Sequence, residues 1–348
     1  MLLDGLHIPL TTPFYPDGRV YLRKLEHNAE RYSRTPASGL TILTRTGERS
    51  LLSDDETRQV LTTAIQASAP HKVMMANVSR DGVSTTLDLA EFAAKLGYDA
   101  LLLQLPGVLA GSAADPKSQE TYFQSIADRS SLPLVLEDNG SLPIDLIAEL
   151  SQNPVFLGAT LYTDGWERLQ QIQAATAQVT REVVVTSIFA PVTRRMSAPA
   201  EAPAAGNYIS AGSLLGGATA LATAPPAPAI KTRLKKVGFQ ILNARTSALL
   251  QALETGAAGS ILPFAACAPQ AVSEVFAAWK DGDPKLAAEK QTRLLAAAAE
   301  IEERWGVAAL KSACDLNGYY GGKPRLPLLP LSGEQRTMVE DLMAGMRN

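Results

Sequence analysis

The stretch Leu43-Thr44-Arg45-Thr46-Gly47-Glu48 decides the fold prediction for this chain of 348 residues. It ends the run Gly39–Leu43, whose short apolar and β-branched pattern is typical of a buried strand. Downstream, Ser53 and Glu56 have the spacing of a capping box, which predicts that a helix begins at Asp54. The strand, loop and helix form a βα unit with hydroxyls and an acid at the carboxyl end of the strand. Ligands bind at this end of the strands in parallel α/β folds.

Strand-like runs alternate with helical patterns along the rest of the chain, which indicates βα repeats and a parallel sheet. Eight strands separated by helices is the count of a (β/α)8 TIM barrel, an α/β fold. We therefore expect a barrel over residues 1–265 and a C-terminal helical extension over residues 266–348, with helices near 272–279, 286–304 and 333–346. The expected strands lie near Leu6–Leu10, Leu40–Leu43, Val73–Asn77, Ala100–Gln104, Leu134–Glu137, Val155–Thr160, Phe239–Leu242 and Gly259–Pro263.

An insertion at about residues 180–237 interrupts the repeat. Its Ala/Pro-rich tracts, Met196–Ala205 and Ala222–Ala229, have a composition that does not bury enough apolar surface to fold by itself. Glu182–Thr186 favours a short strand, and the basic cluster Arg233–Lys236 is interpreted as a solvated loop. Because the insertion precedes the seventh strand, we expect it on the N-terminal face of the barrel, opposite the ligand-binding face. A role in packing or assembly is therefore favoured over catalysis.

Composition excludes several function classes. A net charge of -3 and a pI of about 5.8 argue against nucleic-acid or membrane-surface partners. Cys267 and Cys314 lack metal-ligand spacing and fit a reducing compartment, and the histidines are too dispersed for a metal site. No signal peptide and no apolar run of about 18 residues is found. We expect a soluble, cytoplasmic protein without a metal or cofactor.

Four groups of motifs, in order along the chain, resemble the dihydrodipicolinate synthase / N-acetylneuraminate lyase family, the pyruvate-type class I aldolases. The resemblance covers nearly the whole chain apart from the insertion. It implies the barrel, a C-terminal helical bundle, a homo-oligomer (dimer or tetramer) and a small 2-oxo acid or related anionic metabolite as ligand. The motifs are Thr12-Pro13-Phe14 with Asp17-Gly18, Gly39–Glu56 (similar to a Gly-Thr-Thr-Gly-Glu segment), Gly256–Ile261 with Ala268-Pro269, and Asn317–Gly322 with Pro327–Leu331.

The resemblance also implies a Schiff-base lysine on the sixth strand and a proton-shuttling tyrosine on the fifth. At the matching positions this chain has Thr160 and Glu137. A threonine hydroxyl does not form an imine, and no lysine occurs between Lys117 and Lys231. The chain is therefore expected to be a divergent member in which Schiff-base catalysis is lost or replaced.

Arg45 stands where the family has the first threonine of its Thr-Thr pair, whereas Thr46, Gly47 and Glu48 are retained. Because the family's threonine and tyrosine face each other, we predict a salt bridge between Arg45 and Glu137 in their place. The bridge either fills a vestigial site, or Arg45 binds an anionic ligand while Glu137 acts as a general acid or base.

Three functions remain open from sequence. The first is a carbon–carbon or carbon–oxygen lyase that acts on a small 2-oxo acid without an imine. The second is a catalytically silent homologue that binds a metabolite or a paralogous subunit. The third is a Schiff-base enzyme that uses Lys231, Lys235 or Lys236 of the insertion. The candidate catalytic positions are Glu137, Thr160 and Thr46, and the candidate substrate-binding residues are Arg45, Gly47, Glu48, Tyr162 and Asn243, whereas Glu302, Glu303 and Arg304 are interpreted as a solvated helix face.

Overall fold

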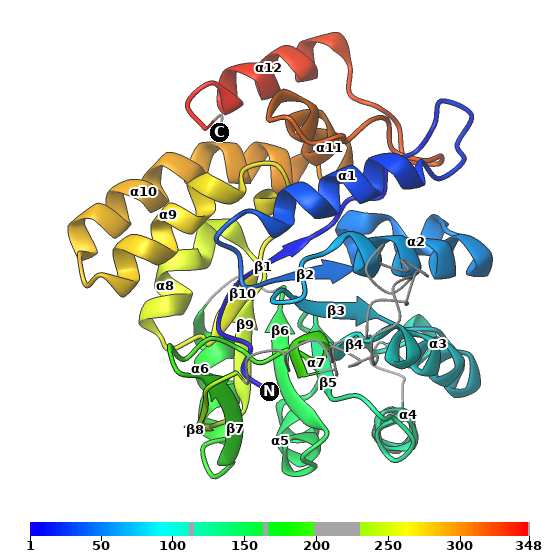
Figure 1. Ribbon diagram of the computed structural model, residues 1–348, viewed down its shortest axis with the longest axis vertical. Coiled ribbons are helices and arrows are strands. Elements are labelled where there is room, and N and C mark those ends of the chain that lie inside the picture. Colours follow the sequence, from blue (N-terminus) through cyan, green and yellow to red (C-terminus); the bar gives the residue numbers. More distant parts are fainter. Residues whose placement is uncertain (111–114, 163–165, 198–229, 347–348) are drawn as a thin grey trace, which may run out of the picture.

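Eight parallel strands close into a barrel in the computed structural model, which describes residues 1–110, 115–162, 166–197 and 230–346 (Figure 1). Each strand pairs with the next barrel strand along the chain, and the last pairs with the first. The (β/α)8 barrel predicted from sequence is therefore confirmed. The barrel strands are β1 (Gly5–Pro9), β2 (Gly39–Ile42), β3 (Val73–Asn77), β4 (Ala100–Gln104), β5 (Leu134–Asp138), β6 (Phe156–Leu161), β9 (Gln240–Asn243) and β10 (Gly259–Ile261).

Helices surround the barrel and bury the outward-facing side chains of its strands (Figure 1). Side chains alternate between the two faces of each strand, so the inward-facing set forms a separate apolar layer that includes Met75, Leu102 and Val135. This layer fills the lower barrel and leaves the polar ends of the strands at its mouth. The surrounding helices are α1 (Leu22–Ser33), α2 (Asp54–Ala67), α3 (Val83–Leu96), α4 (Pro116–Ala127), α5 (Ile144–Gln152), α6 (Trp166–Ala175), α8 (Leu249–Glu254) and α9 (Pro269–Lys280).

The predicted capping box at the start of α2 is confirmed. Ser53 Oγ accepts the backbone N–H of Glu56 at 3.2 Å, and the Glu56 carboxylate accepts the backbone N–H of Ser53 at 2.9 Å. These bonds satisfy N–H groups that the first helical turn leaves unpaired. They fix the direction in which the chain leaves the loop after β2.

The C-terminal extension continues from α9 with α10 (Pro284–Ala297), a π-helical segment (Ala298–Arg304), α11 (Val307–Leu316) and α12 (Gly333–Met343). Helix α11 was missed in the sequence prediction. Gly306, with φ of +59°, separates it from the π-helical segment and lets the chain change direction. The extension packs beside the barrel next to α1 (Figure 1).

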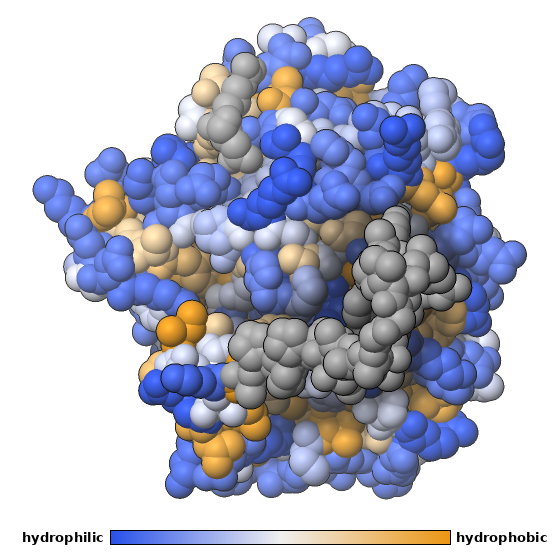
Figure 2. All heavy atoms as spheres, viewed as in Figure 1, coloured by the Kyte–Doolittle hydropathy of each residue, from blue (hydrophilic) through white to orange (hydrophobic). Residues whose placement is uncertain are grey.

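The described parts of the insertion form an antiparallel pair, β7 (Arg181–Thr186) and β8 (Thr232–Val237), and a short helix, α7 (Arg194–Ser197). The strand predicted at Glu182–Thr186 is confirmed. The interpretation of Arg233–Lys236 as a loop is wrong, because these residues pair with β7, although their side chains remain largely exposed. Hydrophobic side chains also reach the surface over this pair (Figure 2), and the exposed ones are Val184, Ile188, Phe189 and Leu234.

The insertion is anchored at the N-terminal ends of the barrel strands. Val183 and Val185 pack against Leu2, which precedes β1. Arg195 donates from its two terminal nitrogens to four backbone carbonyls in the last turn of α2 and the loop before β3, those of Ile65, Ser68, Ala69 and Lys72, at 2.7–3.1 Å. The candidate residues at the strands' carboxyl ends therefore lie at the opposite end of the barrel. In the part of the chain that the structure describes, no helix has the length and apolar character to cross a membrane.

Candidate active site at the barrel mouth

Three strands present polar side chains at the same level of the barrel mouth. The register pairs Gln104 of β4 with Glu137 of β5, and Glu137 with Thr160 of β6. Leu102 and Val135, two residues earlier on β4 and β5, lie in the inward apolar layer. Because side chains alternate along a strand, Gln104 and Glu137 also point into the barrel. The family positions Glu137 and Thr160 are therefore cross-strand neighbours.

Glu137 is a buried acid with neutral donors around it. Its side chain is 5 % exposed, and its carboxyl group accepts hydrogen bonds from the Asn77 amide and the Tyr162 phenol. Burial raises the pKa of Glu137, and the charge of Arg49, the two hydrogen bonds and the charge of Arg45 oppose that rise. A carboxyl with a raised pKa in this position is suited to donate and accept protons.

Arg49, not Arg45, joins the polar network inside the mouth. Its guanidinium donates to the side-chain oxygens of Asn77 and Gln104. Sequence reasoning missed Arg49 because it considered only positions that match the family motif. The sequence does contain a signal for this residue, because a second arginine directly follows Glu48.

The predicted salt bridge between Arg45 and Glu137 is wrong. Arg45 begins a 3-10 turn in which its backbone carbonyl accepts the N–H of Glu48 at 3.0 Å. Its side chain is exposed and makes no hydrogen bond or ion pair with a residue that the structure describes. Glu48 adopts a left-handed conformation with φ of +55°, which starts a second 3-10 turn and brings Arg49 over the strand ends. Arg45 still acts on Glu137 through its charge, since that charge lowers the carboxyl pKa.

Threonine side chains add unbonded hydroxyls to the mouth. Thr160 is fully buried, and its Oγ1 has no hydrogen-bond partner among the described residues. The same holds for Thr44 Oγ1 at the end of β2. Thr46 is buried beside Arg45 and makes no side-chain hydrogen bond with a described residue. The hydrogen-bonding capacity of these hydroxyls is therefore unused among the described residues.

The packing around residue 47 explains why this position is a glycine. Thr12 Oγ1 donates to its carbonyl at 2.6 Å, and a Cβ atom at Gly47 would lie 2.9 Å from the carbonyl oxygen of Leu10. The close approach of the β1 and β2 loops therefore favours glycine there.

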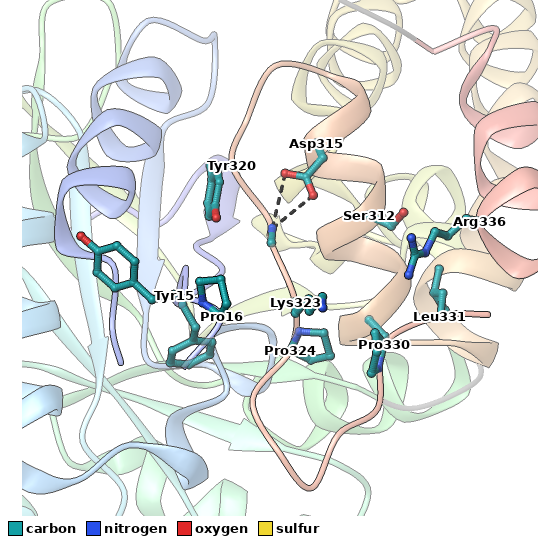
Figure 3. Close-up of a pocket in the computed structure, with 13 residues that line it drawn as sticks. Tyr15, Pro16, Ser312, Asp315, Tyr320, Lys323, Pro324, Pro330, Leu331 and Arg336 are labelled. Carbon is teal, nitrogen blue, oxygen red and sulfur yellow. Dashed lines mark hydrogen bonds between the residues drawn. The ribbon is translucent and has the colours of Figure 1, made fainter. Parts of the chain in front are cut away.

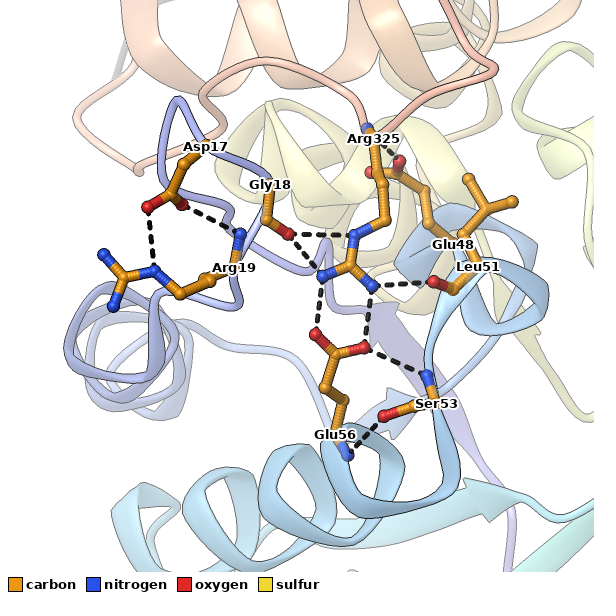
Figure 4. A network of polar contacts seen from close by, with 8 residues as sticks. All are labelled: Asp17, Gly18, Arg19, Glu48, Leu51, Ser53, Glu56 and Arg325. Carbon is orange, nitrogen blue, oxygen red and sulfur yellow. Dashed lines mark hydrogen bonds and ion pairs between the residues drawn. The ribbon is translucent and has the colours of Figure 1, made fainter.

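Glu48 is directed away from the mouth and holds the C-terminal extension. Its carboxylate forms a fully buried ion pair with Lys311 of α11, with Nζ and Oε1 2.5 Å apart, and accepts the backbone N–H of Arg325 at 2.8 Å. The Arg325 side chain in turn binds both carboxylate oxygens of Glu56 and the carbonyls of Gly18 and Leu51 (Figure 4). This network fixes the loop that carries Arg45 and Arg49.

Two more predicted positions have different surroundings from those expected. The Asn243 amide donates to the backbone carbonyl of Arg245, and Asn243 lines a small space with Trp166 and Gln251 outside the barrel. The solvated-face interpretation is wrong for Glu302, whose carboxylate accepts from Thr246 N, Thr246 Oγ1 and Phe264 N. The structure therefore brings Glu137, Thr160 and Tyr162 together, with Arg45 close by, but not Asn243 or Glu48. Among the described residues, no three metal-binding side chains converge.

Comparisons with known proteins identify the family. The sequence model described as "Dihydrodipicolinate synthetase family" matches residues 2–187 and 228–345, which leaves out most of the insertion. The chain is 23 % identical to 4-hydroxy-tetrahydrodipicolinate synthase of Acidiphilium cryptum, over 99 % of both chains. It is 24 % identical to L-threo-3-deoxy-hexylosonate aldolase of Hypocrea jecorina, over 97 % of this chain and 94 % of that one.

Solved structures share the fold over nearly their whole length. N-acetylneuraminate lyase of Mycoplasma synoviae has a TM-score of 0.74 at 16 % identity, over 99 % of this chain and 98 % of that one. The prophage protein YagE of Escherichia coli, solved in complex with pyruvate, has a TM-score of 0.75 at 18 % identity, over 99 % of both chains. The family model spans most of the chain on both sides of the insertion, so this chain belongs to the dihydrodipicolinate synthetase family.

Proposed function

We propose that the barrel mouth binds a small 2-oxo acid and that the protein acts on it as a lyase. The reaction forms no imine, and Glu137 carries out its proton transfers. The observation that carries this proposal is the Glu137 carboxyl, which is buried, has a raised pKa and lies within the charge influence of Arg45 and Arg49. The related YagE was solved with pyruvate, which supports the ligand class.

Imine chemistry is disfavoured by the side chains that replace it. The position on β6 that the resemblance matches to the Schiff-base lysine is Thr160, and a threonine hydroxyl does not form an imine with a carbonyl. The buried amines are committed elsewhere: Lys311 pairs with Glu48, and Lys72 donates to the carbonyls of Thr35 and Ala37. Lys235 and the other lysines of β8 belong to the insertion, at the opposite end of the barrel from Thr160.

A retro-aldol cleavage illustrates the proposed chemistry. The Glu137 carboxylate removes the hydroxyl proton of a 4-hydroxy-2-oxo acid, the adjacent carbon–carbon bond breaks, and its electrons pass to the 2-oxo group as an enolate. The protonated Glu137 then returns the proton to the enolate carbon, which gives an aldehyde and a shorter 2-oxo acid. The Arg45 guanidinium, which has no partner among the described residues, supplies positive charge for the substrate carboxylate and the enolate.

A catalytically silent homologue is the alternative, and one observation favours it. Arg49, Asn77, Gln104 and Glu137 already satisfy one another in a connected network without a ligand. Such a network can hold a ligand-binding surface or a subunit contact without turning over a substrate.

Calorimetric titration with pyruvate, combined with a cleavage assay on 4-hydroxy-2-oxo acids, tests both functions. We expect Arg45→Gln to weaken pyruvate binding about tenfold, since it removes one charged contact. Arg34→Gln, an exposed arginine on the first helix's C-cap, is the matched control and should not change it. Glu137→Gln should retain pyruvate binding but abolish cleavage.

The outcomes separate the alternatives. Binding without cleavage by the wild-type protein would support the silent homologue. Borohydride reduction in the presence of pyruvate should leave the mass of the protein unchanged. A reduced pyruvate adduct on a lysine would overturn the imine-free proposal.

A further inference from the structure

A cavity of about 290 Å³ lies outside the barrel mouth, between the loop that follows β1 and the C-terminal extension (Figure 3). Sites for small molecules commonly span about 300–1,000 Å³, so this volume suits a compact ligand. Four stretches of the chain build its walls: the loop after β1, α11, α12 and the tail, residues 317–332 between these two helices. They contribute Tyr15 and Pro16, Ser312 of α11, Tyr320 and Lys323 of the tail, and Arg336 of α12.

Much of the cavity wall is apolar and conformationally restricted. Pro16, Pro324 and Pro330 line it together with the rings of Phe14 and Tyr320. Proline rings lose little conformational entropy when they are covered, so they favour contact with a flat or compact apolar group.

The tail segment of the cavity wall is also held in place by residues that do not line the cavity. The backbone carbonyl of Lys323 accepts from Lys311 Nζ at 3.1 Å, and the N–H of Arg325 donates to Glu48 at 2.8 Å. Both neighbours of Pro324 are therefore fixed by the buried ion pair, and the wall is formed before a ligand arrives.

Two cationic side chains at this cavity have no partner among the described residues. The side chains of Lys323 and Arg336, from the tail and from α12, reach toward the same space (Figure 3). Neither side chain makes a hydrogen bond or ion pair with any residue that the structure describes. Arg325, two residues from Lys323, differs because its guanidinium is saturated by Glu56 and by backbone carbonyls.

The acid of the cavity does not neutralise these cations. Asp315 instead accepts the backbone N–H groups of Gly321, at 2.9 Å, and Gly322, at 3.2 Å. With one acid against two cations, the charged lining residues carry a net positive charge of one. The lining therefore complements a single negative charge attached to an apolar body.

We propose that this cavity is a second ligand site, which binds a monoanion with a compact apolar body, as in an aromatic carboxylate. The carboxylate lies between Lys323 and Arg336, and the ring packs against the proline-lined wall and Tyr320. The site uses none of the groups of the barrel mouth, so it is independent of the function proposed for Glu137.

Titration with benzoate, read by calorimetry, tests the site, and benzamide serves as the neutral isostere. Arg336→Gln and Lys323→Gln should each weaken benzoate binding about tenfold, and benzamide should bind the wild-type protein about tenfold more weakly than benzoate. Lys285→Gln removes an exposed charge of α10 that has no partner among the described residues and does not line the cavity, and it should have no effect. Arg45→Gln, at the barrel mouth, should have none either.

Three results would overturn the proposal. The first is no benzoate binding to the wild-type protein, and the second is equal loss in the Lys285→Gln control, which indicates general charge attraction. The third is a loss confined to Arg45→Gln, which places benzoate in the barrel mouth. Thermal unfolding of each variant should match the wild type, because the substituted side chains are exposed.

Discussion

Glu137 and Thr160 are direct cross-strand neighbours on β5 and β6, at the level where the barrel opens. The resemblance to the family implies that these two positions match the tyrosine and the lysine of imine chemistry. Here a buried carboxyl and an unbonded hydroxyl occupy them. This implied double replacement is the reason why we propose a carboxyl-based mechanism in place of an imine.

Thr160→Val should leave the protein as stable as the wild type or up to about 1 kcal/mol more stable, because the buried hydroxyl that it removes has no described partner. Thr246→Val is the matched control, since Thr246 is equally buried but donates to Glu302 at 2.6 Å. It should lose about 1–2 kcal/mol. Urea denaturation measures both changes. A comparable loss in Thr160→Val would mean that its hydroxyl is bonded in solution.

Lys311→Met should destabilise the protein by about 3–5 kcal/mol, because it leaves the Glu48 carboxylate buried without its counter-charge. Lys311→Met combined with Glu48→Gln should recover part of that loss. Chemical denaturation in a double-mutant cycle measures the coupling. Lys95→Met removes an exposed pair with Glu91 and should cost less than about 1 kcal/mol. Equal effects at Lys311 and Lys95 would contradict burial of the Lys311 pair.

Glu302→Gln should flatten the dependence of thermal stability on pH. Burial raises the pKa of Glu302 from 4.5 to about 7, although Thr246 and Phe264 donate hydrogen bonds to it. Because the folded pKa lies above the unfolded one, the associated stability is complete below about pH 4.5 and is lost as pH rises through about 7. The wild-type Tm should therefore fall relative to the variant between these pH values.

Glu302→Gln also removes a hydrogen-bond acceptor, which changes Tm by the same amount at every pH. The informative quantity is therefore the slope of the Tm difference between wild type and variant against pH. Glu289→Gln is the control, because Glu289 is an exposed acid on α10 without a hydrogen bond or ion pair to a described residue. A Tm difference that stays flat across this pH range would rule out the raised pKa of Glu302.

Arg195→Gln should lower stability by about 2–3 kcal/mol and speed amide hydrogen exchange in the β7–β8 pair, because four backbone carbonyls lose a charged donor. Arg194→Gln is the adjacent control. The Arg194 guanidinium reaches only the carbonyls of Ala94, at 3.4 Å, and Tyr98, at 3.1 Å. If the two variants behave alike, Arg195 is not the main anchor of the insertion.

The barrel could be predicted from sequence because its signals are local. The apolar run at Gly39–Leu43, the capping box at Ser53 and the regular alternation of strands and helices each depend on residues close together in the chain. The strand at Glu182–Thr186 was found in the same way, whereas β8 was missed because its basic residues resemble a solvated loop.

The site was harder to predict because its geometry depends on the backbone. Arg45 and Arg49 are both plausible partners for Glu137 in sequence, and the left-handed conformation of Glu48 decides which of them enters the polar network. The partner of Glu48 itself lies in α11, and no short-range pattern connects these two residues.

The contact between Arg325 and Glu48 joins residues 277 positions apart, and it therefore affects the order in which the chain folds during synthesis. A chain growing on the ribosome completes all eight barrel strands before α11 and the tail emerge. Until then, the loop with Arg45 and Arg49 lacks the ion pair and the guanidinium that fix it. Since domains generally fold as their residues become available, the nascent barrel closes first and its mouth matures only once Lys311 and Arg325 have emerged.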